Sequence, residues 1–150
     1  MIRENFIRRR EARDDEAISR LIERTILEKN TDIPMWENER MIAIYAPEHF
    51  PEIAETREIY VLEEAGKIVA TAGLTDDGEV AGVFTAADCA GRGYGTRMME
   101  KILARAREKG YARVHLSASI TAHSFYERFD FVDTGETHAD GTVLEMIREL

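Results

Sequence analysis

Glycine occupies every second position in the segment Gly91-Arg92-Gly93-Tyr94-Gly95. A run of this kind removes side chains at alternate positions, so that successive backbone N–H groups can turn toward one point and hold an anion. The chain beyond it has apolar residues at helical spacing, and a helix that begins at the loop adds the partial positive charge of its first turn. These apolar positions are Met98, Met99, Ile102, Leu103 and Ala106. The segment therefore predicts an anion-binding loop that leads into a helix.

Two widespread phosphate-binding fingerprints do not match this loop. The dinucleotide fingerprint G-x-G-x-x-G would need glycine at position 96 or 98, but Thr96 and Met98 stand there. No Gly-Lys-Ser or Gly-Lys-Thr triplet occurs, which excludes the phosphate loop of nucleoside triphosphatases. A glycine-rich turn that only starts a tightly packed helix remains an alternative for this segment taken alone.

The chain before the loop has the pattern of β-strands. Segments 59–62, 67–74 and 79–85 are rich in apolar and β-branched residues. The sequences Ala65-Gly66 and Asp76-Asp77-Gly78 separate these segments and are typical of tight turns. Three strands joined by short turns predict an antiparallel meander that runs into the glycine loop.

The first third of the chain predicts a strand and two helices. Residues 6–10 can form a first strand, and Asp14 can cap the helix that follows it. Apolar positions of that helix recur at helical spacing, at Ile18, Leu21, Ile22, Thr25 and Ile26. A second short helix is expected over 41–45, between Pro34 and Pro47, which restrict the residues before them.

The part of the chain after the glycine loop completes an α+β pattern. Gly110 stands where the C-terminus of the loop helix favours a residue with positive φ. A strand at 114–116 and a short helix within 122–129 follow, and closing strands are expected at 131–132 and 142–147. This order of elements predicts an α+β fold.

Length, charge and cysteine content restrict the class of protein. A chain of 150 residues has the size of one domain, so a single domain is expected over residues 1–150. Its net charge of −9 and pI near 5.0 disfavour nucleic acid as a partner. Without a secretory signal or an apolar run near the roughly 20 residues of a membrane helix, a cytoplasmic protein with no membrane partner is expected. One cysteine, Cys89, and four scattered histidines predict no disulfide and no metal site.

The glycine loop resembles the acetyl-coenzyme A motif of the GNAT superfamily of N-acetyltransferases, written Q/R-x-x-G-x-G/A. Gly93 and Gly95 match its second half, whereas Ala90 stands where glutamine or arginine is usual. The resemblance implies that the loop binds the pyrophosphate of acetyl-coenzyme A, with Arg92 facing phosphate in partial compensation. The cofactor-binding residues that it implies are Val83, Phe84, Thr85, Ala90, Gly91, Arg92, Gly93, Tyr94, Gly95 and Thr96.

Residues 122–131 resemble a second signature of the same superfamily, A-x-x-F-Y-E-K-x-G-F. Their sequence is Ala122-His123-Ser124-Phe125-Tyr126-Glu127-Arg128-Phe129-Asp130-Phe131. Asp130 replaces the usual glycine at a position expected to be left-handed, a conformation that aspartate tolerates better than most residues. The resemblance covers most of the chain apart from residues 30–56, the acceptor-binding region. It implies the superfamily's fold, a mixed, mainly antiparallel central sheet flanked by helices.

The resemblance also implies a reaction, the transfer of an acetyl group from acetyl-coenzyme A to a primary amine of a small molecule or a peptide. Acetyl transfer requires a neutral amine, a donor to the oxyanion and a proton for the departing thiolate. Backbone N–H groups of residues 83–85 are expected at the oxyanion, Tyr126 as the acid and Glu79 as the base. Tyr126 as a core aromatic, Glu79 as a solvated turn residue and water as the base remain alternatives.

Two other functions stay open at the level of sequence. A catalytically inactive module that binds acyl-coenzyme A as a sensor or regulator would keep the loop and lose the reaction. An interaction protein with an accidental glycine loop would bind no coenzyme A. Acidic side chains within residues 30–56 predict an acceptor that is cationic or neutral rather than anionic. The superfamily's habit of dimerising also implies a homodimer.

Overall fold

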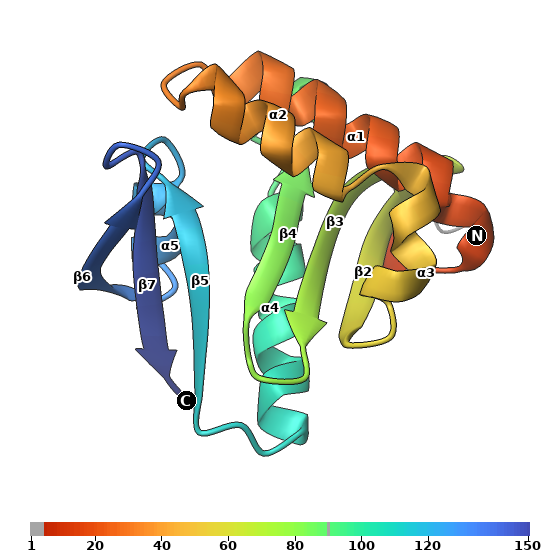
Figure 1. Ribbon diagram of the computed structural model, residues 1–150. Coiled ribbons are helices and arrows are strands. Elements are labelled where there is room, and N and C mark those ends of the chain that lie inside the picture. The colour runs from red at the N-terminus through yellow and green to blue at the C-terminus, as the bar shows by residue number, and fades with distance from the viewer. Residues whose placement is uncertain (1–4, 90) are drawn as a thin grey trace.

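The computed structural model describes residues 5–89 and 91–150 and has an α+β fold with two sheets (Figure 1). One sheet has four antiparallel strands in the order β1-β2-β3-β4, and the other has three in the order β5-β7-β6. The strands of the first sheet are β1 (Asn5–Arg9), β2 (Arg57–Glu64), β3 (Lys67–Thr75) and β4 (Val80–Thr85). Those of the second sheet are β5 (Arg113–Ser119), β6 (Val132–His138) and β7 (Val143–Glu149).

Helices connect the strands and cover the four-stranded sheet. The α-helices are α1 (Asp15–Lys29), α2 (Met35–Ile44), α3 (Phe50–Ile53), α4 (Tyr94–Glu108) and α5 (His123–Glu127). Short 3₁₀ turns are η1 (Ala12–Asp14), η2 (Pro47–His49) and η3 (Ala87–Cys89). The predicted mixed, mainly antiparallel sheet flanked by helices is confirmed.

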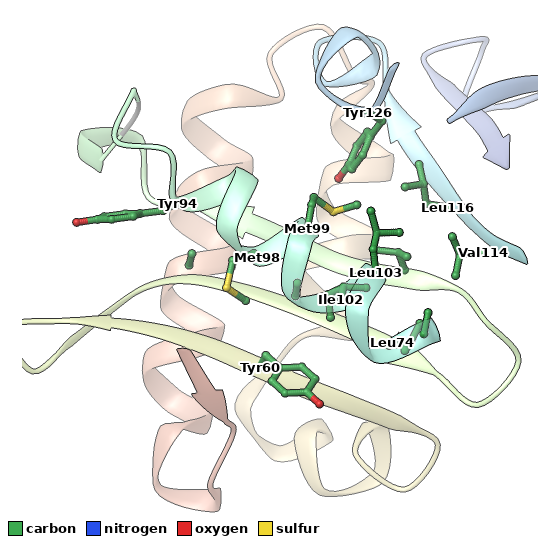
Figure 2. Close-up of a cluster of buried hydrophobic side chains, with 14 of the residues drawn as sticks. Tyr60, Leu74, Tyr94, Met98, Met99, Ile102, Leu103, Val114, Leu116 and Tyr126 are labelled. Carbon is green, nitrogen blue, oxygen red and sulfur yellow. The ribbon is translucent and has the colours of Figure 1, made fainter. Parts of the chain in front are cut away.

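Side chains of β2 alternate between two cores, one on each face of the sheet. Ile59 and Val61 belong to the cluster under α1, while Tyr60 and Leu62 belong to the cluster under α4. Figure 2 shows the second cluster, to which α4 contributes the apolar residues predicted from its helical period. These buried side chains are Met98, Met99, Ile102, Leu103 and Ala106. Gly110 follows the end of α4 with a φ of 79°, as predicted.

The two sheets meet at one narrow point and separate beyond it. Among the described residues, β4 and β5 are joined by an isolated parallel bridge between Glu79 and His115, and the His115 N–H donates to the Gly78 carbonyl at 3.1 Å. From there β4 and β5 run in the same direction and diverge (Figure 1). Residues of both strands line an opening between the sheets, which holds the candidate site.

Several short elements differ from the sequence prediction. The segment after Pro34 forms the whole of α2 rather than residues 41–45 alone. Pro47 and Pro51 lie in the first turns of η2 and α3, which have only three and four residues and therefore show no helical period. Strand β6 extends well beyond residues 131–132, and every one of its residues is exposed, so no alternation of apolar residues marks it.

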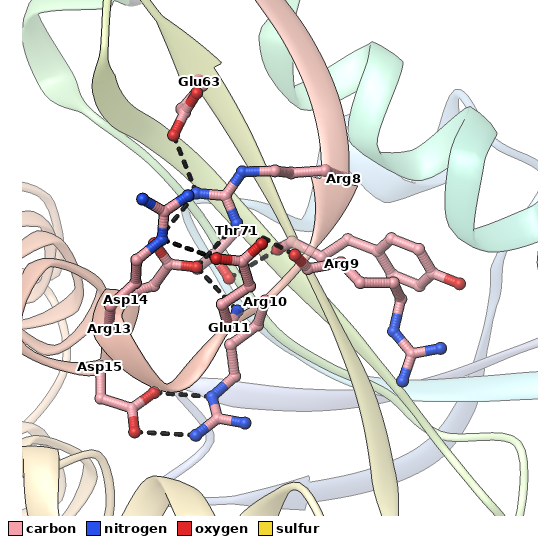
Figure 3. Close-up of polar contacts among 10 residues, drawn as sticks. Arg8, Arg9, Arg10, Glu11, Arg13, Asp14, Asp15, Glu63 and Thr71 are labelled. Carbon is pink, nitrogen blue, oxygen red and sulfur yellow. Dashed lines mark hydrogen bonds and ion pairs between the residues drawn. The ribbon is translucent and has the colours of Figure 1, made fainter.

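Asp14 does not cap α1 through its side chain, contrary to the sequence prediction. Its carboxylate accepts two hydrogen bonds from Arg8, at 2.7 and 2.9 Å, and one from the Glu11 N–H at 2.8 Å. Figure 3 shows this cluster, in which Arg8 also donates to Glu63 on β2. The Arg8 guanidinium holds the pKa of Asp14 below its ordinary value. A carboxylate that is buried and paired with Arg8 is oriented away from the first N–H groups of α1.

Glu58 on β2 joins the sheet to α4. Arg105 donates to both oxygens of its carboxylate, at 2.8 and 3.0 Å, and the Tyr60 hydroxyl donates at 2.8 Å. These donors, Arg105 foremost, hold the pKa of Glu58 at about 2, against an ordinary 4.5. A carboxylate with a lowered pKa contributes stability above its unfolded-state pKa, and the contribution is lost as the pH falls toward the folded-state value.

We therefore expect Glu58→Gln to lower Tm at pH 7, where the carboxylate of the parent chain is ionised and paired. The difference in Tm between parent and variant should shrink as the pH falls from 4.5 toward 2, because the parent then loses the same interaction. Thermal unfolding of both chains across this pH range measures the effect. A difference in Tm that does not depend on pH would contradict it.

Candidate active site

The opening between β4 and β5 is a cleft of about 1270 Å³. The two sheets form its walls, and α1, α2, α5 and the first turn of α4 border it. Pockets for one drug-sized ligand typically measure roughly 300–1,000 Å³, so this cleft exceeds the usual size for one such ligand. The predicted site residues that line it are Glu79, Val83, Phe84, Thr85, Gly91, Gly93, Tyr94, Gly95, Thr96 and Tyr126. Ala90 lies outside the described residues.

Gly91 and Gly93 have a backbone conformation that other residues rarely adopt. Their φ values are 83° and 77°, and Gly93 is the N-cap residue of α4. The first hydrogen bond of the helix runs from the Arg97 N–H to the Gly93 carbonyl at 3.1 Å, so the N–H groups of residues 94–96 have no partner within the helix. These donors lie at the positive end of the helix dipole, on residues that line the cleft. Such an arrangement binds phosphate groups.

Gly95 is required for a different reason, which is close packing. A side chain at this position would place its Cβ 3.2 Å from the Phe125 ring and 3.4 Å from the Thr85 hydroxyl. Glycine therefore lets the first turn of α4 approach both α5 and the end of β4. The Phe125 ring in turn contacts Tyr126, with 5.2 Å between ring centroids. The anion-binding turn is thereby packed against the helix that carries Tyr126.

Arg92 and Tyr94 meet the same carboxylate at the end of β2. Arg92 Nη1 lies 2.9 Å from Glu64 Oε1, and the Tyr94 hydroxyl donates to the other oxygen of Glu64. Tyr94 is buried and lines the cleft, whereas Arg92 points to Glu64 and does not line it. A contact between Arg92 and a phosphate stays a prediction, and in this structure the main chain supplies the donors at this turn.

Strand β4 carries one residue more than the part of β3 that it pairs with. The pairing shifts by one residue between Thr71 and Gly73, opposite Gly82, whose φ is 66°. A bulge of this kind disrupts the ladder and leaves backbone groups without a strand partner. The expected oxyanion donors belong to residues 83–85, all of which line the cleft. Val83 lies in the bulge, whereas Phe84 and Thr85 are again in register with Thr71 and Ala70 of β3.

Tyr126 is a buried tyrosine at the wall of the cleft, with 7% of its surface exposed. Its ring packs edge-on against Phe125 and Phe131, with centroids 5.2 and 6.1 Å away. Figure 2 shows the ring extending from α5 toward α4, near Met99. Its hydroxyl makes no hydrogen bond to any described residue, and burial raises its pKa above the ordinary 10. A phenol in this environment is protonated at neutral pH and can donate.

Tyr126 is more deeply buried than the phenylalanines on either side of it. Helical spacing alone would put Phe125 and Phe129 in the core and Tyr126 at its edge, but Tyr126 is buried and the two phenylalanines are half-buried. The helix has only five residues, and Asp130, with the predicted positive φ of 67°, reverses the chain after it. The reversal brings Phe131 against Tyr126, so the core lies on the Tyr126 side of α5.

Glu79 lies at the closed end of the cleft, one residue before β4. It is half-buried, its carbonyl accepts from the Thr75 N–H at 2.9 Å, and it bridges to His115 of the other sheet. Its carboxylate forms no ion pair with any described residue and can accept a proton from a group in the cleft. His123 is paired with Asp133 at 2.6 Å and does not line the cleft.

Two buried side-chain atoms of the described residues lack a hydrogen-bond partner, Thr25 Oγ1 and Arg57 Nε. Thr25 and Arg57 both line the cleft. Buried polar groups are nearly always paired in native proteins, so these two atoms indicate partners that the described residues do not supply. Arg57 was not predicted, because it begins a strand without any motif. The available signal was Gly73 and Gly82, since an isolated glycine in a strand indicates close approach by another group.

Two further properties concern the described part of the chain as a whole. None of its helices combines the length and the apolar character needed to cross a bilayer. Within the same residues, no group of three or more His, Cys, Asp or Glu side chains is arranged to hold a metal ion.

Comparison with known proteins agrees with this geometry. A family model described as an acetyltransferase (GNAT) domain matches residues 30–145. The chain therefore belongs to the GNAT acetyltransferase family. No curated protein matches the chain significantly in sequence.

Solved structures share the fold over nearly the whole chain. PaiA N-acetyltransferase from Thermoplasma acidophilum, solved in complex with coenzyme A, has a TM-score of 0.86 at 15% identity and covers 99% of this chain and 100% of its own. A GCN5-related N-acetyltransferase from Rhodopseudomonas palustris has a TM-score of 0.85 at 17% identity, with coverage of 100% and 98%. An acetyltransferase from Streptococcus agalactiae has a TM-score of 0.73 at 19% identity, with coverage of 99% and 100%. At these identities the likeness establishes the fold.

Proposed function

We propose that the protein is an N-acetyltransferase that transfers the acetyl group of acetyl-coenzyme A to a primary amine of a small molecule or a peptide. The observation that carries the proposal is one cleft bordered by three sets of groups that the reaction needs. These are the free amides at the start of α4, the amides at the β4 bulge and the Tyr126 phenol. Membership of the GNAT family supports the proposal, as does the complex of Thermoplasma acidophilum PaiA with coenzyme A.

The first turn of α4 fits the pyrophosphate of this co-substrate. The N–H groups of residues 94–96 would hold it, and the positive φ values of Gly91 and Gly93 shape the loop around it. Main-chain donors need no basic side chain, so alanine at position 90 does not remove them. Acetyl-coenzyme A, when bound there, supplies an activated thioester.

Three groups of the chain would then stabilise the developing negative charge and transfer the two protons of the reaction. A backbone N–H within residues 83–85 would donate to the oxygen on which negative charge develops. Tyr126 would hold the proton that the departing thiolate needs. Glu79 would take a proton from the amine, with a water relay because it lies at the closed end of the cleft, and water alone is the alternative base.

We expect Glu79→Gln to lower kcat/KM at neutral pH by about 10²-fold, the lower end of general-base contributions. The substitution keeps the size of the side chain and removes its ability to accept a proton. Measurement of kcat/KM for parent and variant under saturating acetyl-coenzyme A tests this expectation. An unchanged rate in Glu79→Gln would identify water as the base.

The activity itself is tested by following thiol release from acetyl-coenzyme A over a panel of amines. The panel contains amino acids, polyamines, aminoglycosides and peptide amines, and release that depends on one of them supports the proposal. Binding of coenzyme A without turnover of any amine would favour a catalytically inactive sensor. An absence of both binding and turnover would exclude the enzyme and the sensor alike.

A further inference from the structure

Arg57, the first residue of β2, reaches the cleft by lying across the neighbouring strand. A Cβ at Gly73 on β3 would lie 2.7 Å from Arg57 Cδ and 3.1 Å from its Cγ, so glycine leaves the space that this side chain occupies. Arg57 Nη1 donates to the Tyr45 hydroxyl at 2.9 Å, and a Cβ at Gly82 would lie 3.6 Å from Nη1. The guanidinium therefore ends beside the β4 bulge, at the wall of the cleft.

The charge of Arg57 is uncompensated within the described residues. The side chain is half-buried and forms no ion pair with any carboxylate there, and its Nε is buried without a hydrogen-bond partner. Three other half-buried arginines, Arg8, Arg10 and Arg105, each pair with a carboxylate, the first two as shown in Figure 3. Burying a cation without a counter-charge is costly. Its position at a cleft indicates that a ligand supplies the anionic group.

Tyr45 adds a second donor at the same place. Its hydroxyl accepts from Arg57 and retains its own proton for donation to an oxygen of a ligand. The Phe84 ring, edge-on at 6.2 Å between centroids, packs against the Tyr45 ring. A planar guanidinium matches the two oxygens of a carboxylate. The nearest acidic residue of α2 that lines the cleft, Glu37, is held by Arg40 at 2.7 and 2.8 Å, so its charge is already compensated.

We propose that Arg57 and Tyr45 bind a carboxylate of the acceptor, and that acceptors are therefore amines with a carboxylate close to the amino group, such as α-amino acids. This inference rests on the proposed function. A carboxylate held beside the bulge leaves an α-amino group, one carbon away, near the N–H groups of residues 83–85. The acidic composition of residues 30–56 suggested a cationic or neutral acceptor. A zwitterion is neutral overall and still matches the positive charge of Arg57.

The test compares free L-amino acids with their amides as acceptors of the acetyl group. We expect the parent chain to favour the acid of the best-accepted amino acid over its amide by about 10- to 100-fold in kcat/KM, the range for a charge-assisted hydrogen bond. Arg57→Gln should reduce this ratio to near one, and Arg57→Lys should leave an intermediate ratio. Intrinsic differences between the two amines cancel when the ratios of parent and variant are compared.

A second variant moves Arg57 without replacing it. Gly73→Ala puts a Cβ where the stem of Arg57 lies and should also lower the preference for the acid. Arg105→Gln is the control, because this half-buried arginine pairs with Glu58 and does not line the cleft, and it should keep the ratio of the parent. The rise in Tm with coenzyme A shows that each variant is folded.

Three outcomes would overturn the inference. They are equal turnover of acid and amide by the parent chain, a preference for the acid that survives Arg57→Gln, and turnover of polyamines or aminoglycosides with no turnover of any amine that carries a carboxylate. In each of these outcomes the proposed acetyltransferase activity stands. A panel in which no amine of any class releases thiol overturns the activity together with the inference, so the two failures are distinguishable.

Discussion

Replacing Tyr126 with phenylalanine is expected to lower kcat by about 10²- to 10⁴-fold, the usual contribution of a general acid. The substitution removes the hydroxyl and keeps the ring that packs on Phe125 and Phe131. Because the hydroxyl makes no hydrogen bond to a described residue, its removal leaves no buried partner unsatisfied. Stability and affinity for coenzyme A should therefore change little, and the loss should appear in turnover alone.

The pKa values of the Tyr126 phenol and of the departing thiol determine how Tyr126 can act as an acid. Ordinary pKa values are about 10 for a phenol and about 8.5 for a thiol, and burial raises the pKa of Tyr126 further. Tyr126 is therefore protonated at neutral pH, but transfer of its proton to a thiolate is unfavourable by at least about 2 kcal/mol. The transfer becomes productive when the Tyr126 phenolate takes up another proton at once. The amine releases a proton when it is acetylated, and this proton can restore the phenol. The proposed role thus couples loss of the amine proton to departure of the thiol.

Tyr60 provides a matched control for this experiment. It is a tyrosine of the same core with 4% of its surface exposed, and its hydroxyl donates to Glu58 instead of facing the cleft. Tyr60→Phe should retain the kcat of the parent, as measured by thiol release under saturating acetyl-coenzyme A. If Tyr126→Phe stays within about threefold of the parent while chemistry limits the rate, Tyr126 is a core aromatic and water supplies the proton.

Substituting valine for Gly93 is expected to abolish the rise in Tm that coenzyme A causes in the parent chain. A ligand at 100 times its Kd stabilises the folded state by about 2.7 kcal/mol. Position 93 has a φ of 77°, which a β-branched residue rarely adopts, so valine would displace the N-cap of α4. A Cβ there meets no atom of the other described residues within 4 Å, so it would occupy open space at the turn proposed to bind pyrophosphate. Thermal unfolding with and without coenzyme A measures the loss.

Gly110, at the opposite end of α4, separates loss of binding from loss of stability. Its φ is 79° and a Cβ there also meets no described atom within 4 Å, so Gly110→Val imposes similar backbone strain away from the cleft. Both variants should melt below the parent when no ligand is present, but only Gly93→Val should lose the response to coenzyme A. A full response in Gly93→Val would place the binding site elsewhere.

The sequence by itself determined the elements that depend on local patterns. The apolar period of α4 and the turn residues of the meander predicted those elements, because both signals lie within a few neighbouring residues. Gly110 and Asp130 have the positive φ that their positions predicted, since this preference belongs to the residue and its immediate neighbours. Elements of three or four residues, such as η2 and α3, were missed because they are shorter than one clear period.

Only the tertiary structure decided which residues meet in the cleft. Tyr126 is buried because the chain reverses at Asp130 and returns Phe131 against it, a contact that the spacing of α5 does not contain. Arg57 reaches the β4 bulge because strand register places Gly73 beside its stem and because Tyr45 comes from a separate segment. The cleft itself exists because β4 and β5 separate after one bridge. Arg57 and Gly73 are far apart in the chain, as are β4 and β5, and Tyr126 meets Phe131 only through the reversal at Asp130. No periodic pattern of residues specifies these partners.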